Sequence, residues 1–232
     1  MSEPQLTLDL FSATHHDFAA FRADVNAETV TTLERWCVGA GPRVIYLWGK
    51  PGSGKSHLLQ AAVRAVGEDG ARAMYVPLAQ LGEAGPGILD ELHRVDIVAL
   101  DDIGVCAGRI EWEERLFVLY NAIQEAGGRL LWSGERNPAA AFFELGDLAS
   151  RLSASLIYQL RELDDAAKAA VLVQAAAQRG LDLPVPVIDF IMRRERRDLG
   201  ALMALLDKLD RASLSHGRAL TVPFVRTVLA AR

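Results

Sequence analysis

Five short apolar runs alternate with amphipathic segments in the first two thirds of the chain. Each run has the length of a buried strand, and the segments around the runs repeat their apolar residues at helical spacing. The strand-like runs cover residues 43–48, 71–78, 95–102, 129–133 and 155–160. The helix-like segments cover residues 24–36, 57–67, 110–126 and 139–145. Strands that alternate with helices are typical of a parallel sheet, so the pattern predicts an α/β fold with five parallel strands.

The pattern changes after residue 163. Helix-like segments then follow one another without a strand between them, and Gly180 is well placed to end the first of them. These segments cover residues 164–179, 187–194, 199–215 and 223–230. An all-helical end indicates a separate small subdomain. We therefore divide the chain into a flexible N-terminal segment (1–14), an α/β domain (15–162) and a helical domain (163–232).

Composition narrows the class of protein. The chain has 232 residues, is 50% hydrophobic and carries a net charge of -5, which is a poor match to a dedicated DNA-binding protein. Its two cysteines, Cys37 and Cys106, lack metal-ligand spacing and are expected to be buried thiols. No apolar run has the length of a membrane span, and the first residues are polar. We expect a cytoplasmic protein without a membrane partner.

Residues 49–56 read GKPGSGKS and match the G-x-x-x-x-G-K-[ST] pattern of a phosphate-binding loop. Glycines let the backbone wrap closely around a phosphate chain, with successive N–H groups turned inward. Lys55 is expected to reach the phosphates of ADP or ATP, and the Ser56 hydroxyl is expected to hold Mg²⁺. An apolar strand precedes the loop and a helix former follows it, as this motif requires.

Polar residues follow two later strands and one short helix. Asp101 and Asp102 close the third strand, where Asp101 would hold hydrated Mg²⁺ and Asp102 would orient the attacking water. The stretch 133–136 (SGER) follows the fourth strand and faces the ligand edge of a parallel sheet. Arg151 precedes the fifth strand, and its permanently charged fork suits stabilisation of a neighbour's phosphates. The charge run 193–197 is typical of a solvated face.

Taken together, these motifs resemble an AAA+ ATPase of the DnaA clade, and within it the Hda-type regulators of replication initiation. The resemblance covers nearly the whole chain. It implies an AAA+ P-loop domain with a five-stranded parallel sheet, followed by a small all-helical lid subdomain. The stretches that carry it are 48–59, 147–152, 209–213 and 220–225, together with 5–10 (QLTLDL).

The resemblance implies a function exerted on a partner. Such a protein binds a nucleotide, with ADP expected, docks on the DNA sliding clamp and presents Arg151 in trans to ATP held by DnaA. Hydrolysis of that ATP prevents re-initiation of chromosome replication. DNA is then reached only through the clamp and DnaA, and self-association into dimers or higher oligomers is compatible with the family. The protein's own ATPase activity is expected to be weak or absent.

The resemblance also assigns residues to roles. Asp101 and Asp102 order the protein's own nucleotide and, with Ser56, its Mg²⁺. The clamp contacts fall on Gln5, Leu6, Leu8 and Leu10. The nucleotide contacts fall on Gly49, Lys50, Pro51, Gly52, Ser53, Gly54, Lys55, Ser56, His57, Glu135 and Arg197.

Two departures from the family pattern bear on this interpretation. Gly200 stands where the family's lid carries an arginine that reaches the nucleotide, and Arg196 and Arg197 lie about one helical turn earlier. Glu135 stands where relatives often have aspartate. Two other functions are compatible with the phosphate loop. One is an ATPase of the helicase-loader type, and the other is a small-molecule P-loop kinase, which the helical end of the chain disfavours.

Overall fold

The computed structural model describes residues 17–81, 84–194, 198–216 and 219–230. The predicted clamp residues Gln5, Leu6, Leu8 and Leu10, and also Arg197, lie outside these ranges. None of the described helices is long and apolar enough to cross a membrane.

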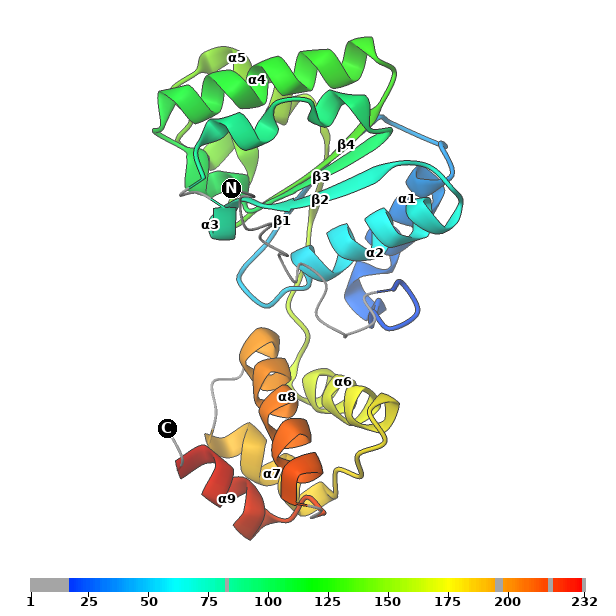
Figure 1. Cartoon of the computed structure of the whole chain (residues 1–232), viewed down its shortest axis with the longest axis vertical. Helices are drawn as coiled ribbons and strands as arrows, with labels where there is room; N and C mark the ends of the chain where they lie inside the picture. The colour runs from blue at the N-terminus through cyan, green and yellow to red at the C-terminus, as the bar shows by residue number, and fades with distance from the viewer. Residues whose placement is uncertain (1–16, 82–83, 195–197, 217–218, 231–232) are drawn as a thin grey trace, which may run out of the picture.

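A five-stranded, all-parallel sheet forms the centre of the α/β part, as the sequence predicts (Figure 1). Its spatial order is β2-β3-β4-β1-β5, so β1 lies between the two strands that come last in the chain. The strands are β1 (Val44–Trp48), β2 (Ala73–Pro77), β3 (Ile97–Asp101), β4 (Arg129–Gly134) and β5 (Leu156–Gln159).

Helices cover both faces of the sheet. Helices α1 and α2 lie on one face, and α4 and α5 lie on the other (Figure 1). The helices of this part are α1 (Ala27–Cys37), α2 (Lys55–Glu68), α3 (Leu78–Leu81), α4 (Ile110–Glu125) and α5 (Gly146–Ser153). Single 3-10 turns cover η1 (Asp24–Asn26), η2 (Pro86–Leu89), η3 (Leu92–Arg94), η4 (Ile103–Cys106) and η5 (Pro138–Ala140).

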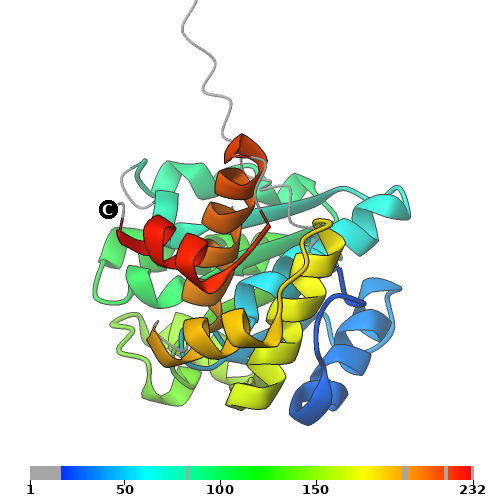
Figure 2. The same ribbon diagram turned by 90° about the horizontal axis from the view of Figure 1, so that it is seen from below.

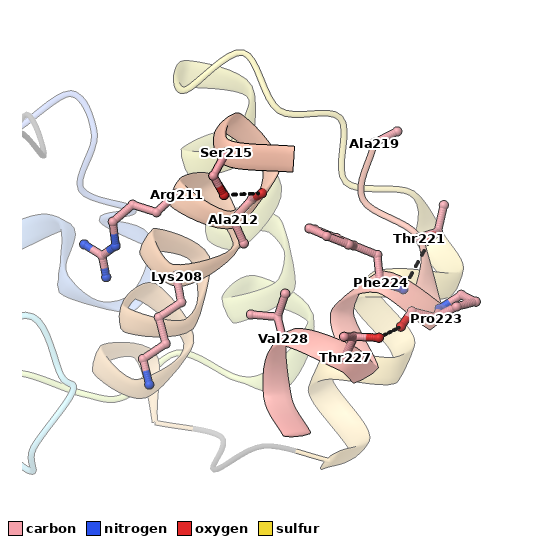
Figure 3. A pocket seen from close by; sticks show the side chains of 10 residues that line it. All are labelled: Lys208, Arg211, Ala212, Ser215, Ala219, Thr221, Pro223, Phe224, Thr227 and Val228. Atoms are coloured by element: carbon pink, nitrogen blue, oxygen red, sulfur yellow. Dashed lines mark hydrogen bonds between the residues drawn. The ribbon is translucent and has the colours of Figure 1, made fainter. Parts of the chain in front are cut away.

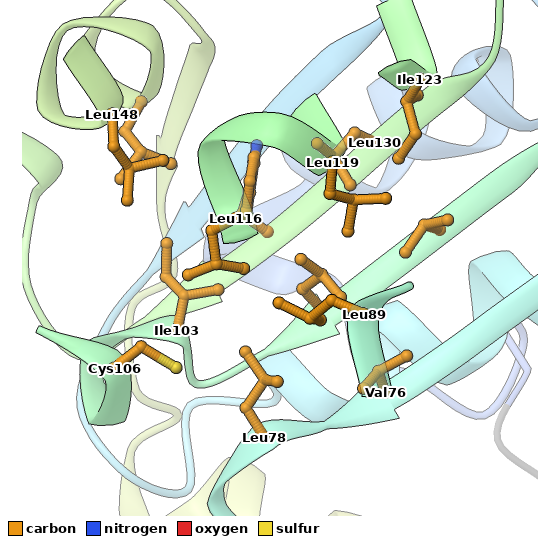
Figure 4. Packing of buried hydrophobic residues seen from close by; sticks show 14 of the residues in the cluster. Val76, Leu78, Leu89, Ile103, Cys106, Leu116, Leu119, Ile123, Leu130 and Leu148 are labelled. Atoms are coloured by element: carbon orange, nitrogen blue, oxygen red, sulfur yellow. The ribbon is translucent and has the colours of Figure 1, made fainter. Parts of the chain in front are cut away.

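Alternating side chains of each strand build two separate cores, because successive residues of a strand point to opposite faces. On β3, Val98 and Leu100 join the core under α4 and α5, which Figure 4 shows at close range. Ile97 and Ala99 join the core under α1 and α2. Both cysteines are buried in these cores, as predicted, and burial raises the pKa of each thiol to about 12. They are therefore packing residues and not reactive thiols.

Four helices make up the C-terminal part: α6 (Asp165–Gln178), α7 (Val185–Arg194), α8 (Leu199–His216) and α9 (Val222–Ala230). α6 packs on α7 and α8, and α9 packs on the same two helices. The view from below shows these helices in front of the sheet (Figure 2). They enclose a third apolar core of their own. The predicted C′ role of Gly180 is confirmed, since its φ is +71° just after α6. We retain the division at residues 162 and 163 as a proposal.

Two local predictions were wrong. Residues 139–145 do not form a helix: Asn137 caps a single turn through the Ala139 N–H, at 3.0 Å, and the chain is extended again at Ala141. Asn26 stands at the start of α1, but its side chain does not cap that helix. It instead exchanges two hydrogen bonds with the backbone of Arg161, which tie α1 to the segment after β5.

Candidate nucleotide-binding site

The loop between β1 and α2 has the shape that the glycine pattern predicts. Gly52 and Gly54 have φ values of +79° and +98°, which favour glycine. A Cβ at Gly49 would lie 2.6 Å from the carbonyl oxygen of Leu160, and one at Gly54 would lie 2.5 Å from the Phe21 ring. Only glycine fits at these positions. The loop therefore brings bare backbone to the amino end of α2, where free N–H groups favour an anion.

Two buried polar groups of the loop test whether a phosphate chain fits. The Lys55 ammonium is buried and donates to the carbonyl oxygens of Gly49 and Lys50, at 2.8 and 3.2 Å. The Ser53 hydroxyl is buried and has no hydrogen-bond partner among the described residues. A buried hydroxyl without a partner is unfavourable, and a bound phosphate would supply one. The loop therefore fits a polyphosphate ligand.

Asp101 is held by two hydroxyl groups at the carboxyl edge of the sheet. The Tyr75 phenol donates to Asp101 Oδ2 at 2.6 Å, and the Ser133 hydroxyl donates to Oδ1. Ser133 also accepts from the Asp102 N–H at 2.9 Å. Burial and the Asp101 carboxylate raise the pKa of Tyr75, so the phenol keeps its proton and remains a donor. Sequence reasoning missed Tyr75, because a tyrosine in a strand is a common core residue.

The two predicted metal ligands meet at Tyr75. Ser56 and Gln60 lie near the same phenol that binds Asp101, and they lower its pKa while burial raises it. The structure therefore brings Ser56 and Asp101 to one place. Among the described residues, no group of three or more His, Cys, Asp or Glu side chains is arranged to hold a metal ion. Mg²⁺ usually takes one or two protein ligands together with phosphates and water.

Asp102 and Glu135 line a cavity of about 540 Å³ beside this network, together with Tyr46 and Phe142. Asp102 has a φ of +57°, in the left-handed region. Burial raises its pKa, the Asp101 and Glu135 carboxylates raise it further, and Lys55 opposes them. Ionised Asp102 is thus an unfavourable neighbour of Asp101, as the adjacent acids in the sequence predict.

The segment 17–21 before α1 packs over the loop, a contact that sequence reasoning missed. The His57 ring donates its Nε2–H to the Asp17 carbonyl oxygen at 2.8 Å and packs beside Phe21, with the ring centroids 5.5 Å apart. Phe21 also covers Gly54. The predicted nucleotide residue His57 therefore contacts this segment. Phe18 and Phe21 were the only available signal, and two apolar residues three apart are common in any helix or turn.

The start of α8 lies against the phosphate loop. A Cβ at Gly52 would lie 3.2 Å from the Leu199 nitrogen and 3.4 Å from the Asp198 Cβ. Asp198 caps α8 by accepting from the Ala201 N–H at 2.8 Å. The helical part thus meets the loop through backbone and an acid, and Gly200 offers no cation there.

Arg151 lies in a different place. It stands on α5, exposed, and its guanidinium lies 5.7 Å from the ring centroid of Tyr120 on α4. In the part of the chain that the structure describes, it forms no ion pair. Strand register pairs Ile45 with Leu156 and Trp48 with Gln159. Helix α5 therefore leads into the end of β5 that lies farthest from the phosphate loop.

Glu113 holds the chain just before α5 in place, and sequence reasoning missed this residue. Its side chain is fully buried and accepts from the Gly108 N–H and the Leu145 N–H, each at 2.7 Å. Leu145 is the residue before α5. One carboxylate on α4 therefore anchors both the loop before α4 and the start of the arginine-bearing helix.

A further cavity, of about 1020 Å³, lies between α8 and α9 (Figure 3). Phe224 and Val228 of α9 contribute apolar side chains to it, while Lys208 and Arg211 extend from α8. No residue to which the sequence assigned a role lies there.

Comparison with known proteins identifies the helical end. Residues 165–229 match the family model for the Hda lid domain. The helical end is therefore a lid related to that of Hda, and the α/β part with the parallel sheet has the AAA+ fold, as the sequence predicts.

Solved structures share the fold at low sequence identity. Domain III of DnaA from Thermotoga maritima is 21% identical, with 94% of this chain and 96% of that chain covered and a TM-score of 0.80. AMPPCP-bound DnaA from Aquifex aeolicus is 20% identical, with 88% and 67% covered and a TM-score of 0.67. DnaI is 14% identical, with 64% and 89% covered and a TM-score of 0.54.

Proposed function

We propose that this DnaA-related AAA+ protein binds ADP or ATP with Mg²⁺, docks on the DNA sliding clamp and stimulates hydrolysis of ATP held by DnaA. Its catalytic contribution is Arg151, supplied in trans. Hydrolysis of that ATP prevents re-initiation of chromosome replication. The observation that carries the proposal is the separation of Arg151 from the phosphate loop of its own chain.

Three features of Arg151 support action on a neighbour. Its helix packs on α4, on the opposite face of the sheet from α2, and leads into the far end of β5. Its guanidinium is exposed and has no carboxylate partner among the described residues. A guanidinium placed against a reacting phosphate stabilises the charge that develops during phosphoryl transfer.

The protein's own nucleotide has a structural part in this proposal. The loop 49–56 would hold its phosphates, with Lys55 released from the loop carbonyls to bind them and Ser53 gaining its missing partner. Ser56 and Asp101 would hold Mg²⁺, which neutralises phosphate charge when bound. Tyr75 and Ser133 keep Asp101 in one orientation for that role.

The lid gives little reason to expect fast hydrolysis of this nucleotide. Among the described residues of the lid, the Leu199 nitrogen and Asp198 lie at Gly52 of the loop, and Gly200 follows them in the chain. A carboxylate and a glycine cannot replace the charge of an arginine at the phosphates. We propose that the bound nucleotide sets the shape of the protein, and that its turnover is slow. Clamp docking rests on Gln5, Leu6, Leu8 and Leu10 and remains a prediction from the sequence.

The test is a reconstitution with ATP-bound DnaA and DNA-loaded clamp from the same organism. The wild-type protein should accelerate conversion of DnaA-bound ATP to ADP, followed as labelled nucleotide on DnaA. Arg151→Ala should reduce that stimulation about 10³-fold or more, the scale of an arginine finger. Its own affinity for ADP should not change, because Arg151 lies far from the loop.

Arg115→Ala is the matched control, since Arg115 is an exposed arginine on α4 that pairs with Asp90 at 2.9 Å. It should retain the wild-type rate. Full stimulation by the Arg151 variant would refute the role of Arg151. A wild-type protein that leaves DnaA unchanged but loads a helicase would favour the helicase-loader alternative.

A further inference from the structure

The guanidinium of Arg151 rests on an aromatic platform. It lies 5.7 Å from the ring centroid of Tyr120 on α4. The Tyr120 ring in turn stacks on Trp132 of β4, with centroids 6.4 Å apart and planes 15° apart. Trp132 is completely buried in the core between the sheet and α4. An exposed, flexible side chain is therefore held by one that is anchored in the sheet.

This arrangement matters because an arginine on a short helix has many rotamers. Presenting its fork to a phosphate in one geometry costs the freedom of those rotamers, and a contact that restricts them beforehand lowers that cost. The face of an aromatic ring attracts a guanidinium at this distance. Tyr120 thus limits where Arg151 points before any partner arrives.

We propose that Tyr120 is a positioning residue for Arg151, which it holds ready for the partner's ATP. This inference rests on the proposed function. It assigns a role to the ring face of Tyr120 and none to its hydroxyl. A phenylalanine at position 120 should therefore work, and an aliphatic residue should not.

The experiment compares Tyr120→Leu with Tyr120→Phe in the reconstituted hydrolysis assay. The maximal rate and the half-saturating concentration of this protein are measured separately. Tyr120→Leu should lower the maximal rate about two- to fivefold, the scale of one exposed cation–π contact. Tyr120→Phe should keep the wild-type rate. Neither should change the half-saturating concentration, because positioning acts on the reaction and not on docking.

Val118→Ala is the matched control, since Val118 is 58% exposed on the same helix. It changes the surface of α4 without touching the platform and should leave the maximal rate unchanged. If Tyr120→Leu melts below the assay temperature, Tyr120→Met has about the same volume, adapts more easily to the space and gives the same comparison. In an Arg151→Ala background, Tyr120→Leu should have no further effect, which isolates the coupling between the two residues.

Equal rates for the leucine variant and the wild type would overturn the inference, as would equal losses in the leucine and phenylalanine variants. A faster leucine variant would mean that Tyr120 restrains Arg151, and would also overturn it. These failures differ from failure of the proposed function. In that case Arg151→Ala itself would retain stimulation, whatever the Tyr120 variants do.

Discussion

The nucleotide site and the surface around Arg151 are built in opposite ways. At the carboxyl edge of the sheet, Lys55, Asp101 and Ser133 are buried, and each is held by hydrogen bonds. On the side of the sheet that α4 and α5 cover, Arg151 is exposed on a short helix and is held by a single ring contact. A buried network fixes atoms in place and suits a ligand that stays bound. An exposed cation on a supported helix suits a group that is offered to another molecule.

This difference separates binding from catalysis within one chain. The carboxyl edge has the chemistry of nucleotide binding, and the catalytic group that we propose lies elsewhere. The two parts are joined through packing, since β4 carries Ser133 at the site and Trp132 under Tyr120. Substitutions at the nucleotide site and substitutions around Arg151 should therefore have different consequences.

Glu113→Ala should have the largest effect on stability. It removes a fully buried carboxylate and leaves the Gly108 and Leu145 N–H groups without partners. The expected loss is about 3 kcal/mol, or roughly 6–12 °C in Tm. Tryptophan fluorescence during thermal unfolding measures it, because all four tryptophans lie in the α/β part. Stimulation of DnaA should also fall, since the start of α5 is released.

The control for this prediction is Glu114→Ala, the exposed neighbour on the same helix. It should change Tm by no more than about 2 °C. A Glu113 variant as stable as wild type would mean that α5 is held by its apolar contacts alone, and the anchoring role would be wrong.

Lys55→Ala should weaken binding of ADP about 10- to 100-fold, the value of charge-assisted hydrogen bonds to phosphates. Isothermal titration calorimetry with Mg²⁺ measures the affinity. Arg64→Ala is the control, since Arg64 is an exposed cation on the same helix that pairs with Glu68 at 2.8 Å. Equal affinities of both variants for ADP would contradict the assignment of Lys55 to the phosphates. The phosphate loop would then not differ from the surface around Arg151 in the way described above.

Tyr75→Phe should lower the affinity for Mg²⁺ and ADP together by about three- to tenfold, because Asp101 loses one of its two donors. Affinity for ADP without Mg²⁺ should change less. Tyr158→Phe is the control. It removes a comparable phenol on β5, which shares a hydrogen bond of 3.0 Å with the Thr32 hydroxyl on α1, and it should leave both affinities unchanged. A loss that is the same with and without Mg²⁺ would argue against a link between Tyr75 and the metal.

Asp102→Asn should give a small gain in stability that grows with pH. Burial raises the folded-state pKa of Asp102 above its ordinary value of 3.8, so the folded state holds the proton more tightly than the unfolded state. Ionisation of this carboxyl therefore costs stability as pH rises through the folded-state pKa. The variant escapes that cost, and its Tm advantage without ligand should be present at pH 7 and vanish below pH 3.8.

Asp96→Asn should have the opposite effect on stability. Hydrogen bonds from Arg72 lower the pKa of Asp96, so its ionised form stabilises the folded state. Its replacement should lower Tm at neutral pH. A difference in Tm between Asp102→Asn and the wild type that does not depend on pH would contradict the prediction. It would show that the Asp102 carboxyl of the wild type is well solvated.

Much of this architecture could be predicted from the sequence. The five strands and the parallel sheet followed from the short apolar runs, because burial on both faces of a strand requires them. The loop at 49–56 followed from its glycines, and Asp101 from its place at the end of β3. The failed helix at 139–145 shows the limit. Apolar spacing favoured a helix, but Asn137 caps a single 3-10 turn at 138–140, and the chain is extended at Ala141 and at Leu145, which Glu113 anchors.

The fold class, the phosphate loop and the place of Arg151 just before the last strand could all be predicted from the amino-acid sequence alone. These depend on local spacing, on residues such as glycine with distinct backbone freedom, and on the periodicity of apolar side chains. Three contacts could be found only in the folded molecule. Tyr75 and Ser133 hydrogen-bond Asp101, Glu113 anchors the start of α5, and the Tyr120 ring supports Arg151. Each of these contacts joins residues from different elements, and no spacing along the chain encodes which side chains a fold brings within bonding distance.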